Sequence, residues 1–262
     1  MLVESMTPLQ MEMMKRAHRG DLLARLFFAP WEGMETPDSW QKELLSSLVT
    51  NQRNVICNCS RQSGKTTVTS LAALILACTG KFVLVVSASD RQAMEFMRRL
   101  KRHHARLNLA QAIRDNDHEM DFQGGGKVLA LPKSEGTIRG FSAVDLLVID
   151  EAAKVPDAIY NAVRPMLIVS RGQTALLSSP DGRRGFFYEE WQGKGDWQRF
   201  RIPWNMCPRI KPTDIEAERQ RPGVIVEQEY LDCGPGEEFL ATSGAVFDTQ
   251  CWQDLLDNNF GE

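Results

Sequence analysis

The stretch CSRQSGKT at residues 59–66 decides the fold of this chain. The apolar run NVICNCS leads into it and TVTSLAALILACTG follows, so strand, tight turn and helix are predicted in that order. In such a turn, backbone N–H groups and a helix N-terminus point at a phosphate, a lysine reaches the outer phosphates and a hydroxyl holds magnesium. Gly64, Lys65 and Thr66 supply these parts. We therefore predict a phosphate loop; the alternative is an ordinary tight turn capped by Ser63.

The loop also departs from the usual GxxxxGK(S/T) pattern. Cys59 stands at the first glycine, which is tolerable if the backbone there is still extended from the strand. Arg61 and Gln62 fill positions that are usually small. The Arg61 guanidinium is predicted to reach the γ-phosphate or a neighbouring acid and so to add charge. Its alternative is a surface ion pair, because arginine is usually exposed.

Strand and helix patterns alternate along the rest of the chain. Apolar runs predict further strands, and two segments with apolar residues at helical spacing predict helices. This alternation predicts an α/β fold of the P-loop NTPase type, with a mostly parallel sheet covered by helices on both faces and ligands at the carboxyl ends of the strands. The predicted strands are 81–89, 128–132, 145–152 and 174–180, and the predicted helices include 40–49, 90–107, 160–168 and 213–220.

Two adjacent carboxylates follow a buried run in LLVIDEA at residues 146–152. The run predicts that Asp150 and Glu151 lie at the carboxyl end of a strand in the same sheet as the phosphate loop. Asp150 is then predicted to hold Mg²⁺, and Glu151 to orient and activate the attacking water. The alternative is a solvated turn. With Glu151 in this role, the chain is a candidate hydrolase rather than a nucleotide-dependent binding or scaffold module.

Composition gives little sign of a partner. The 262 residues include 31 Lys and Arg against 34 Asp and Glu, a net charge of -3, so any DNA contact needs a local basic patch. The densest basic stretch, RRLKRHHARL at 98–107, is either such a patch or the solvated face of an amphipathic helix. Six cysteines form no CxxC pair, which favours reduced thiols. No membrane span and no signal peptide are predicted.

Together these motifs resemble the ATPase domain of the large terminase subunit, the DNA-packaging motor of tailed bacteriophages. The likeness spans roughly residues 37–247 and implies a RecA-like fold of the class with an additional strand and a catalytic glutamate. The motifs that carry it are WQ at 40–41, SRQSGKTT at 60–67, VSASDRQA at 86–93, TIRG at 137–140, LLVIDEAA at 146–153 and LLSSPDG at 176–182.

The resemblance implies roles for individual residues. Gln41 reads the adenine, Lys65 and Thr66 bind the phosphates and magnesium, and Ser178 and Ser179 form the motif that couples hydrolysis to movement. Arg139 enters the active site of a neighbouring subunit in a ring; its alternative is a structural arginine after a turn. With ATP and Mg²⁺ as cofactors, the implied ATP-binding set is Gln41, Ser60, Arg61, Gln62, Ser63, Gly64, Lys65, Thr66 and Thr67.

The implied partners are double-stranded DNA, a portal protein, a small terminase subunit and further copies in a homo-oligomeric ring, with a monomer when isolated, in the host cytoplasm. The expected organisation is an N-terminal helical arm and linker at 1–36, the ATPase core at 37–204, and a lid-like subdomain at 205–262 that leads toward an absent nuclease domain. Asp248, Asp254 and Asp257 are too isolated to build a nuclease site. We expect an ATPase half, either truncated or naturally short. A helicase-like translocase is the rival enzyme and would need a second RecA-like domain.

Overall fold

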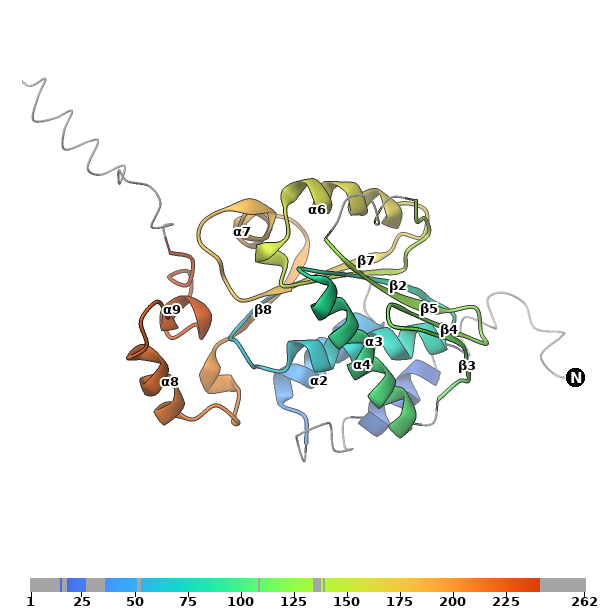
Figure 1. The fold of residues 1–262 in the computed structure, drawn as a ribbon, viewed down its shortest axis with the longest axis horizontal. Helices are drawn as coiled ribbons and strands as arrows, with labels where there is room; N and C mark the ends of the chain where they lie inside the picture. The colour runs from blue at the N-terminus through green and yellow to red at the C-terminus, as the bar shows by residue number, and fades with distance from the viewer. Residues whose placement is uncertain are drawn as a thin grey trace, which may run out of the picture.

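The computed structural model describes residues 15, 18–26, 36–50, 53–107, 109–133, 138 and 140–240. Within them, eight strands form one sheet in the order β3-β4-β5-β2-β6-β7-β1-β8 (Figure 1). Their bounds are β1 Asn54–Cys59, β2 Phe82–Ser87, β3 Ala112–Asp115, β4 Glu119–Phe122, β5 Lys127–Pro132, β6 Leu146–Asp150, β7 Gln173–Ser178 and β8 Trp197–Ile202.

Six neighbouring strands of the sheet run parallel, from β5 to β8 in the spatial order, and β3 and β4 add an antiparallel edge. Strand β7 lies between β1, which enters the phosphate loop, and β6, which carries the acidic pair. Asn58 of β1 is level with Ser178 of β7, and Leu177 is level with Asp150 of β6. The loops that follow these three strands therefore meet at one edge of the sheet. The predicted parallel sheet with an additional strand is confirmed.

Helices cover both faces of this sheet (Figure 1). One face carries α2 Ser39–Thr50, α3 Lys65–Cys78 and α4 Asp90–Leu107, and the other carries α6 Asp157–Val163 and α7 Gly185–Gln192. Beyond β8 lie α8 Pro212–Arg219 and α9 Val226–Glu229. The described residues also form three short 3-10 helices: η1 Ala152–Lys154, η2 Arg164–Leu167 and η3 Trp204–Met206.

The alternation of side-chain direction along each strand explains why a hydrophobic layer forms on each face of the sheet. Along β1, Val55, Cys57 and Cys59 face the cluster that contains α2, α3 and α4, whereas Ile56 faces the cluster that contains α6 and α7. Successive side chains of a strand point to opposite faces, so an unbroken apolar run serves both layers at once. This is why the apolar runs located the central strands correctly.

Segments before α2 and after β8 add helices and buried side chains to the fold. Residues 18–26 are helical, and Leu22, Leu23 and Leu26 are buried in the cluster with α2, α3 and α4. The rest of the predicted arm and the linker before Thr36 lie outside the described residues. After β8, a separate small cluster of Ile215, Val226 and Tyr230 holds α8 and α9 together. A lid function for this C-terminal segment, which we take as residues 203–240, stays a prediction.

Several other expectations can be compared with the structure. Cys59 is the last residue of β1 and is level with Ile202 of β8, so its backbone is extended and needs no glycine. All five cysteines in the described part are free thiols, and Cys251 lies outside it. Strands β3, β4 and β8 and helices α7 and α9 were not predicted. Among the described helices, none combines the length and the apolar composition that a membrane span requires.

Candidate nucleotide-binding site

The phosphate loop connects β1 to α3 and turns through left-handed backbone conformations. Gly64 has φ 97° and Gln62 has φ 57°. A Cβ on Gly64 would lie 2.9 Å from Nε2 of Gln41, so glycine is required there by both conformation and space. Helix α3 begins at Lys65 directly after this turn, and its first N–H groups have no partner earlier in the helix. The loop therefore has the shape that receives a phosphate.

Two buried contacts join the loop to the end of β6. The Nζ of Lys65 lies 2.7 Å from Oε1 of Glu151, and the Oγ1 of Thr66 donates to Oδ2 of Asp150 at 3.3 Å. Lys65 is 8% exposed and Asp150 7% exposed. The sequence placed these four side chains at one edge of the sheet, and the structure brings them into direct contact. Their assigned chemical roles stay predictions.

The electrostatics of the four side chains follow from burial and from opposite charges. Burial alone would lower the pKa of Lys65, but the charges of Glu151 and Asp150 raise it above its usual value. Burial would raise the pKa of Glu151, but the ion pair with Lys65 lowers it below its usual value. For Asp150, burial wins over the attraction of Lys65, and its pKa is raised. Lys65 and Glu151 are thus held as a charged pair.

The Thr66 hydroxyl and the Asp150 carboxylate fit a hard divalent cation, because both present oxygen ligands and Mg²⁺ prefers oxygen. Across the described ranges, no group of three or more His, Cys, Asp or Glu side chains could hold a metal. A magnesium ion here would therefore take its remaining ligands from nucleotide phosphates and water, as is usual for this ion. Asp150 and Thr66 are the residues that would hold it.

Glu151 stands in an unusual backbone conformation. Its φ of 54° is left-handed, and its N–H donates to Oδ1 of Asp150 at 3.1 Å. A left-handed non-glycine residue costs on the order of 1 kcal/mol or more and persists only where its surroundings fix it. Here the turn after β6 directs the Glu151 carboxylate to Lys65, whereas the Asp150 carboxylate points to Thr66.

The two predicted coupling serines follow the strand between these loops. Ser178 is fully buried, and its Oγ accepts a hydrogen bond from the backbone N–H of Ala153 at 3.2 Å. Ala153 lies two residues after Glu151, so the end of β7 touches the acidic turn. Ser179 is 6% exposed. This contact places the serines beside the site, and their coupling role stays a prediction.

Arg61 pairs with a residue of the C-terminal segment in this structure. Its guanidinium lies 3.1 Å from Oε1 of Glu229, its backbone N–H donates to the Glu229 carbonyl at 2.8 Å, and its side chain is 48% exposed. The expected neighbouring acid is thus Glu229 of α9, in the arrangement of a surface ion pair. Contact of Arg61 with a γ-phosphate stays a prediction. Arg139 lies outside the described residues.

The remaining predicted residues surround the loop. Gln41 is fully buried, its Oε1 accepts from the Asp38 N–H at 2.9 Å, and its amide lies against Gly64. Ser60, Ser63 and Thr67 are also buried. The Ser60 N–H donates to the Ile202 carbonyl of β8 at 2.8 Å. Recognition of adenine by Gln41 stays a prediction.

Three residues near the loop were missed by the sequence analysis, and all come from β8 or beyond. Arg209 contacts Asp38 and Ser63, Glu229 contacts Arg61, and the fully buried Glu238 accepts a hydrogen bond from Asn58 at 3.0 Å. Arg201 of β8 lies 3.6 Å from the same Glu238 oxygen. The contacts of Arg209 with Asp38 and Ser63, of Glu229 with Arg61 and of Glu238 with Asn58 join positions more than 100 residues apart, so no local pattern could have identified them.

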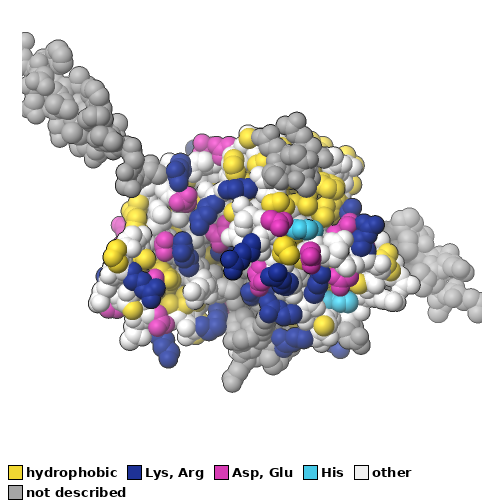
Figure 2. Space-filling view, viewed as in Figure 1, with side chains coloured by type: hydrophobic (Ala, Val, Ile, Leu, Met, Phe, Trp, Pro, Cys, Tyr) yellow, Lys and Arg dark blue, Asp and Glu magenta, His cyan; other side chains and the backbone are white. Residues whose placement is uncertain are grey.

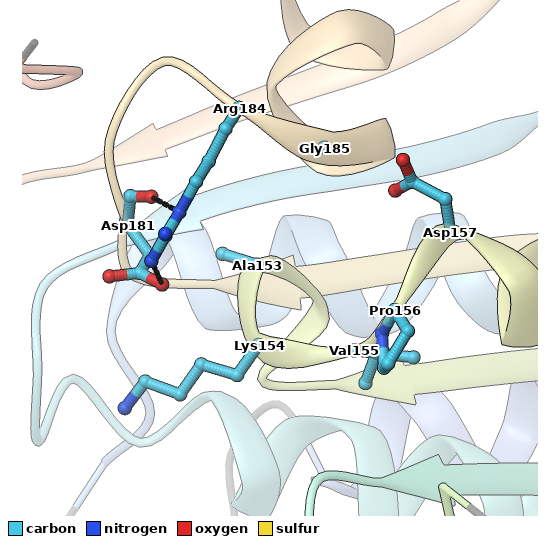
Figure 3. Close-up of a pocket in the computed structure, with 8 residues that line it drawn as sticks. All are labelled: Ala153, Lys154, Val155, Pro156, Asp157, Asp181, Arg184 and Gly185. Atoms are coloured by element: carbon cyan, nitrogen blue, oxygen red, sulfur yellow. Dashed lines mark hydrogen bonds and ion pairs between the residues drawn. The ribbon is translucent and has the colours of Figure 1, made fainter. Parts of the chain in front are cut away.

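A hollow of about 480 Å³ lies beside the acidic turn (Figure 3). It is formed by the segments that follow β6 and β7, and an ion pair between Asp181 and Arg184, 3.0 Å apart, crosses one side of it. Asp157 accepts the N–H of Phe186 at 2.8 Å at the start of α7. The lining residues are Ala153, Lys154, Val155, Pro156, Asp157, Asp181, Arg184 and Gly185.

The basic stretch at 98–107 forms the C-terminal part of α4. Ala93, Phe96, Met97, Leu100 and His103 form its buried face. Arg98 and Arg102 on the outer face contact Glu95 at 3.3 and 3.4 Å. Figure 2 shows Lys and Arg side chains on the face in view, with Asp and Glu among them. The amphipathic interpretation of this stretch is confirmed, and DNA contact by it is untested.

A model of the family described as "Terminase large subunit, T4likevirus-type, N-terminal" matches residues 56–250. The chain belongs to this family. The resemblance drawn from the motifs is thereby confirmed.

Curated relatives match shorter stretches. The large terminase subunit of Thermus phage G20c is 27% identical over 129 residues, which are 42% of this chain and 25% of that protein. The tRNA(Met) cytidine acetyltransferase TmcA of Haloferax volcanii is 33% identical over 102 residues, 39% of this chain and 13% of that protein. The matched part is therefore a small share of each relative.

Solved structures share the fold over most of the chain. The large terminase ATPase domain of Thermus phage P74-26 has a TM-score of 0.61 at 22% identity, covering 78% of this chain and 94% of that one. The large terminase of a second thermophilic bacteriophage, solved in complex with ADP, has a TM-score of 0.62 at 16% identity, covering 75% and 53%. The predicted fold class is confirmed by these neighbours.

Proposed function

We propose that this chain is the motor domain of a viral large terminase, which hydrolyses ATP with Mg²⁺ to drive double-stranded DNA into a procapsid. The observation that carries the proposal is the double contact of Lys65 with Glu151 and of Thr66 with Asp150. It unites a phosphate-binding lysine, a cation-binding oxygen pair and a candidate base in one buried place. Family membership supports the same function, as does the structural neighbour that was solved in complex with ADP.

In this mechanism, the loop residues 60–67 receive the triphosphate on their backbone N–H groups. Lys65 turns from Glu151 to the outer phosphates, because these carry more negative charge than one carboxylate. That exchange releases the Glu151 carboxylate to orient the attacking water and to accept its proton. Thr66 and Asp150 would hold Mg²⁺, which would neutralise charge on the phosphate oxygens. The Lys65–Glu151 pair thus keeps the base occupied until nucleotide arrives.

The proposal includes partners that the resemblance implies. Ser178 and Ser179 would couple movement of the acidic turn to movement of β7, because the Oγ of Ser178 accepts a hydrogen bond from the backbone N–H of Ala153 in that turn. Arg139 of a neighbouring copy would complete the site in a homo-oligomeric ring. A portal protein and a small terminase subunit would join this ring in the host cytoplasm, and Gln41 would recognise the adenine.

The test is ATP turnover with and without duplex DNA, across a range of protein concentration. Replacing Glu151 by Gln should leave ATP and Mg²⁺ binding intact and lower turnover on the order of a hundredfold or more, the typical loss for a water-orienting base. Glu189→Gln on the exposed face of α7 is the matched control and should turn over normally. Equal turnover in Glu151→Gln and the parent would remove Glu151 from the mechanism. A parent that binds ATP without hydrolysis would be a nucleotide-dependent scaffold.

A further inference from the structure

Arg209 joins three segments that are distant in the sequence. It lies in the turn between η3 and α8, 171 residues after Asp38 and 146 after Ser63. One guanidinium nitrogen donates to Oδ1 of Asp38 at 3.1 Å, and a second donates to Oδ2 at 2.8 Å. That second nitrogen also donates to the Ser63 carbonyl at 3.0 Å. The planar fork of arginine is suited to such a set of fixed contacts.

The contact with Ser63 determines how one peptide of the phosphate loop is turned. In a trans peptide, the carbonyl and the following N–H point in opposite directions. When Arg209 holds the Ser63 carbonyl, the N–H of Gly64 points in the opposite direction within that peptide plane. Gly64 has a left-handed φ of 97°. Because glycine has no Cβ, its backbone can also adopt other conformations, which would turn the peptide differently. A fixed carbonyl removes that freedom.

The contact with Asp38 links Arg209 to Gln41, which also lies beside Gly64. The N–H of Asp38 donates to Oε1 of Gln41, and the Gln41 amide lies against Gly64. Gln41 Nε2 and Ser63 Oγ are both buried, and neither has a hydrogen-bond partner within the described part of the chain. Buried polar atoms of this kind ordinarily have partners, so two of them beside Gly64 indicate a site that meets a polar ligand.

We propose that Arg209 is a positioning residue for nucleotide binding, which holds the Ser63–Gly64 peptide in the orientation that receives the phosphates. This inference rests on the proposed function, because it names a residue that prepares the same site. Arg209 acts through the loop and through Asp38. Its role is therefore in affinity, and the chemical step that follows binding does not depend on it.

The experiment compares the parent with Arg209→Ala and Arg209→Lys. Affinity for ATP and for inorganic tripolyphosphate, which has no base, is measured by calorimetry, and KM and kcat by steady-state turnover. Arg219→Ala is the matched control, since Arg219 lies on α8 of the same segment and pairs with Glu227 and Asp232 away from the loop. Melting curves show whether each variant is folded.

Arg209→Ala should weaken the binding of both ATP and tripolyphosphate about tenfold, the scale of one lost charge-assisted hydrogen bond. KM should rise in parallel, with kcat within about twofold of the parent. Arg209→Lys should recover little of this loss, because lysine keeps the charge and lacks the fork. Arg219→Ala should bind both ligands as the parent does.

Other results would overturn the assignment. Unchanged affinity in Arg209→Ala, an equal loss in Arg219→Ala, a loss confined to kcat, or a loss confined to ATP would each do so. If Arg209→Ala does not fold, Asp38→Asn weakens the same fork from its other end and should lower both affinities about threefold; parental affinity there also overturns the proposal. A parent that binds ATP without turnover refutes the motor function alone, and one that binds neither ligand refutes both.

Discussion

The inner and outer sides of the phosphate loop are held by contacts of different kinds. On the inner side, Lys65 and Thr66 are held by Glu151 and Asp150, which come from the buried strand β6. On the outer side, Arg61 and Ser63 are held by Glu229 and Arg209 of the C-terminal segment, in contacts that are more exposed. The inner contacts join groups that would take part in the chemistry. The outer contacts set the shape of the loop. Substitutions that break inner or outer contacts should therefore affect ATP binding and turnover differently.

The largest expected effect on turnover comes from Arg139, which would reach the site from a neighbouring copy and belongs to neither side of the loop. If Arg139 completes the site of a neighbouring copy, Arg139→Ala should lower kcat about 10³-fold, the scale for such an arginine. Specific activity of the parent should rise with protein concentration, because dilution separates each site from its arginine. Turnover against concentration measures this.

Mixing variants sharpens that trial. Arg139→Ala and Glu151→Gln are each expected to be inactive alone, yet a mixed ring contains interfaces where an intact Glu151 meets an intact Arg139. Some activity should return on mixing. A mixture that stays inactive while both proteins are folded and co-assembled would show that Arg139 does not act between copies. Arg61, in the same chain as the loop, would then be the better candidate for that charge.

Breaking the inner side should come next in size. Lys65→Ala removes the charge that meets the outer phosphates, so ATP affinity should fall about a hundredfold. Lys81→Ala is the matched control, because Lys81 also pairs with a carboxylate, that of Asp145 at 3.0 Å, at the opposite edge of the sheet. Calorimetric titration with ATP measures both. Parental affinity in Lys65→Ala would contradict the assignment of the loop.

Breaking the Arg61–Glu229 pair alone should have the smallest effect, and of opposite sign. If Arg61 turns to the γ-phosphate when nucleotide binds, its pair with Glu229 must open first. Glu229→Gln should therefore tighten ATP binding about two- to threefold, since a half-exposed ion pair contributes little. Glu227→Gln, whose partner is Arg219, should change nothing. Weaker ATP binding in Glu229→Gln would instead make the Arg61–Glu229 pair part of the binding-competent loop.

The same division separates what the sequence predicted from what it did not. Lys65, Thr66, Asp150 and Glu151 follow apolar runs that can only be buried parallel strands, and the strand order brings their ends together. The motif chemistry and the hydrophobic pattern therefore agree at these positions. The central fold and the inner side of the site could be predicted for this reason.

The edge strands of the sheet and the outer side of the loop could not be predicted from the sequence. Strand β8, WQRFRI, has buried Trp197, Phe200 and Ile202 interrupted by polar side chains and lacks the continuous apolar run of a central strand. Strands β3 and β4 are four residues long and carry charges. Arg209 and Glu229 stand in polar stretches that look like any solvated surface, and only the folded chain reveals their partners. Trp197 and Trp204 donate their indole N–H groups to Glu190 and Asp232, contacts that the sequence pattern does not show.

The buried pair of Glu238 and Asn58 has a practical consequence for anyone who wishes to shorten this protein. A fragment cut after residue 204, where the motifs alone would end the catalytic unit, loses Arg209, Glu229 and Glu238 in one step. It also leaves the Asn58 amide, two residues before the loop, buried without its acceptor, a defect of about 1–3 kcal/mol. The smallest fragment with an intact loop therefore extends through Glu238, and fragments that end just before and just after that residue should differ sharply in melting temperature.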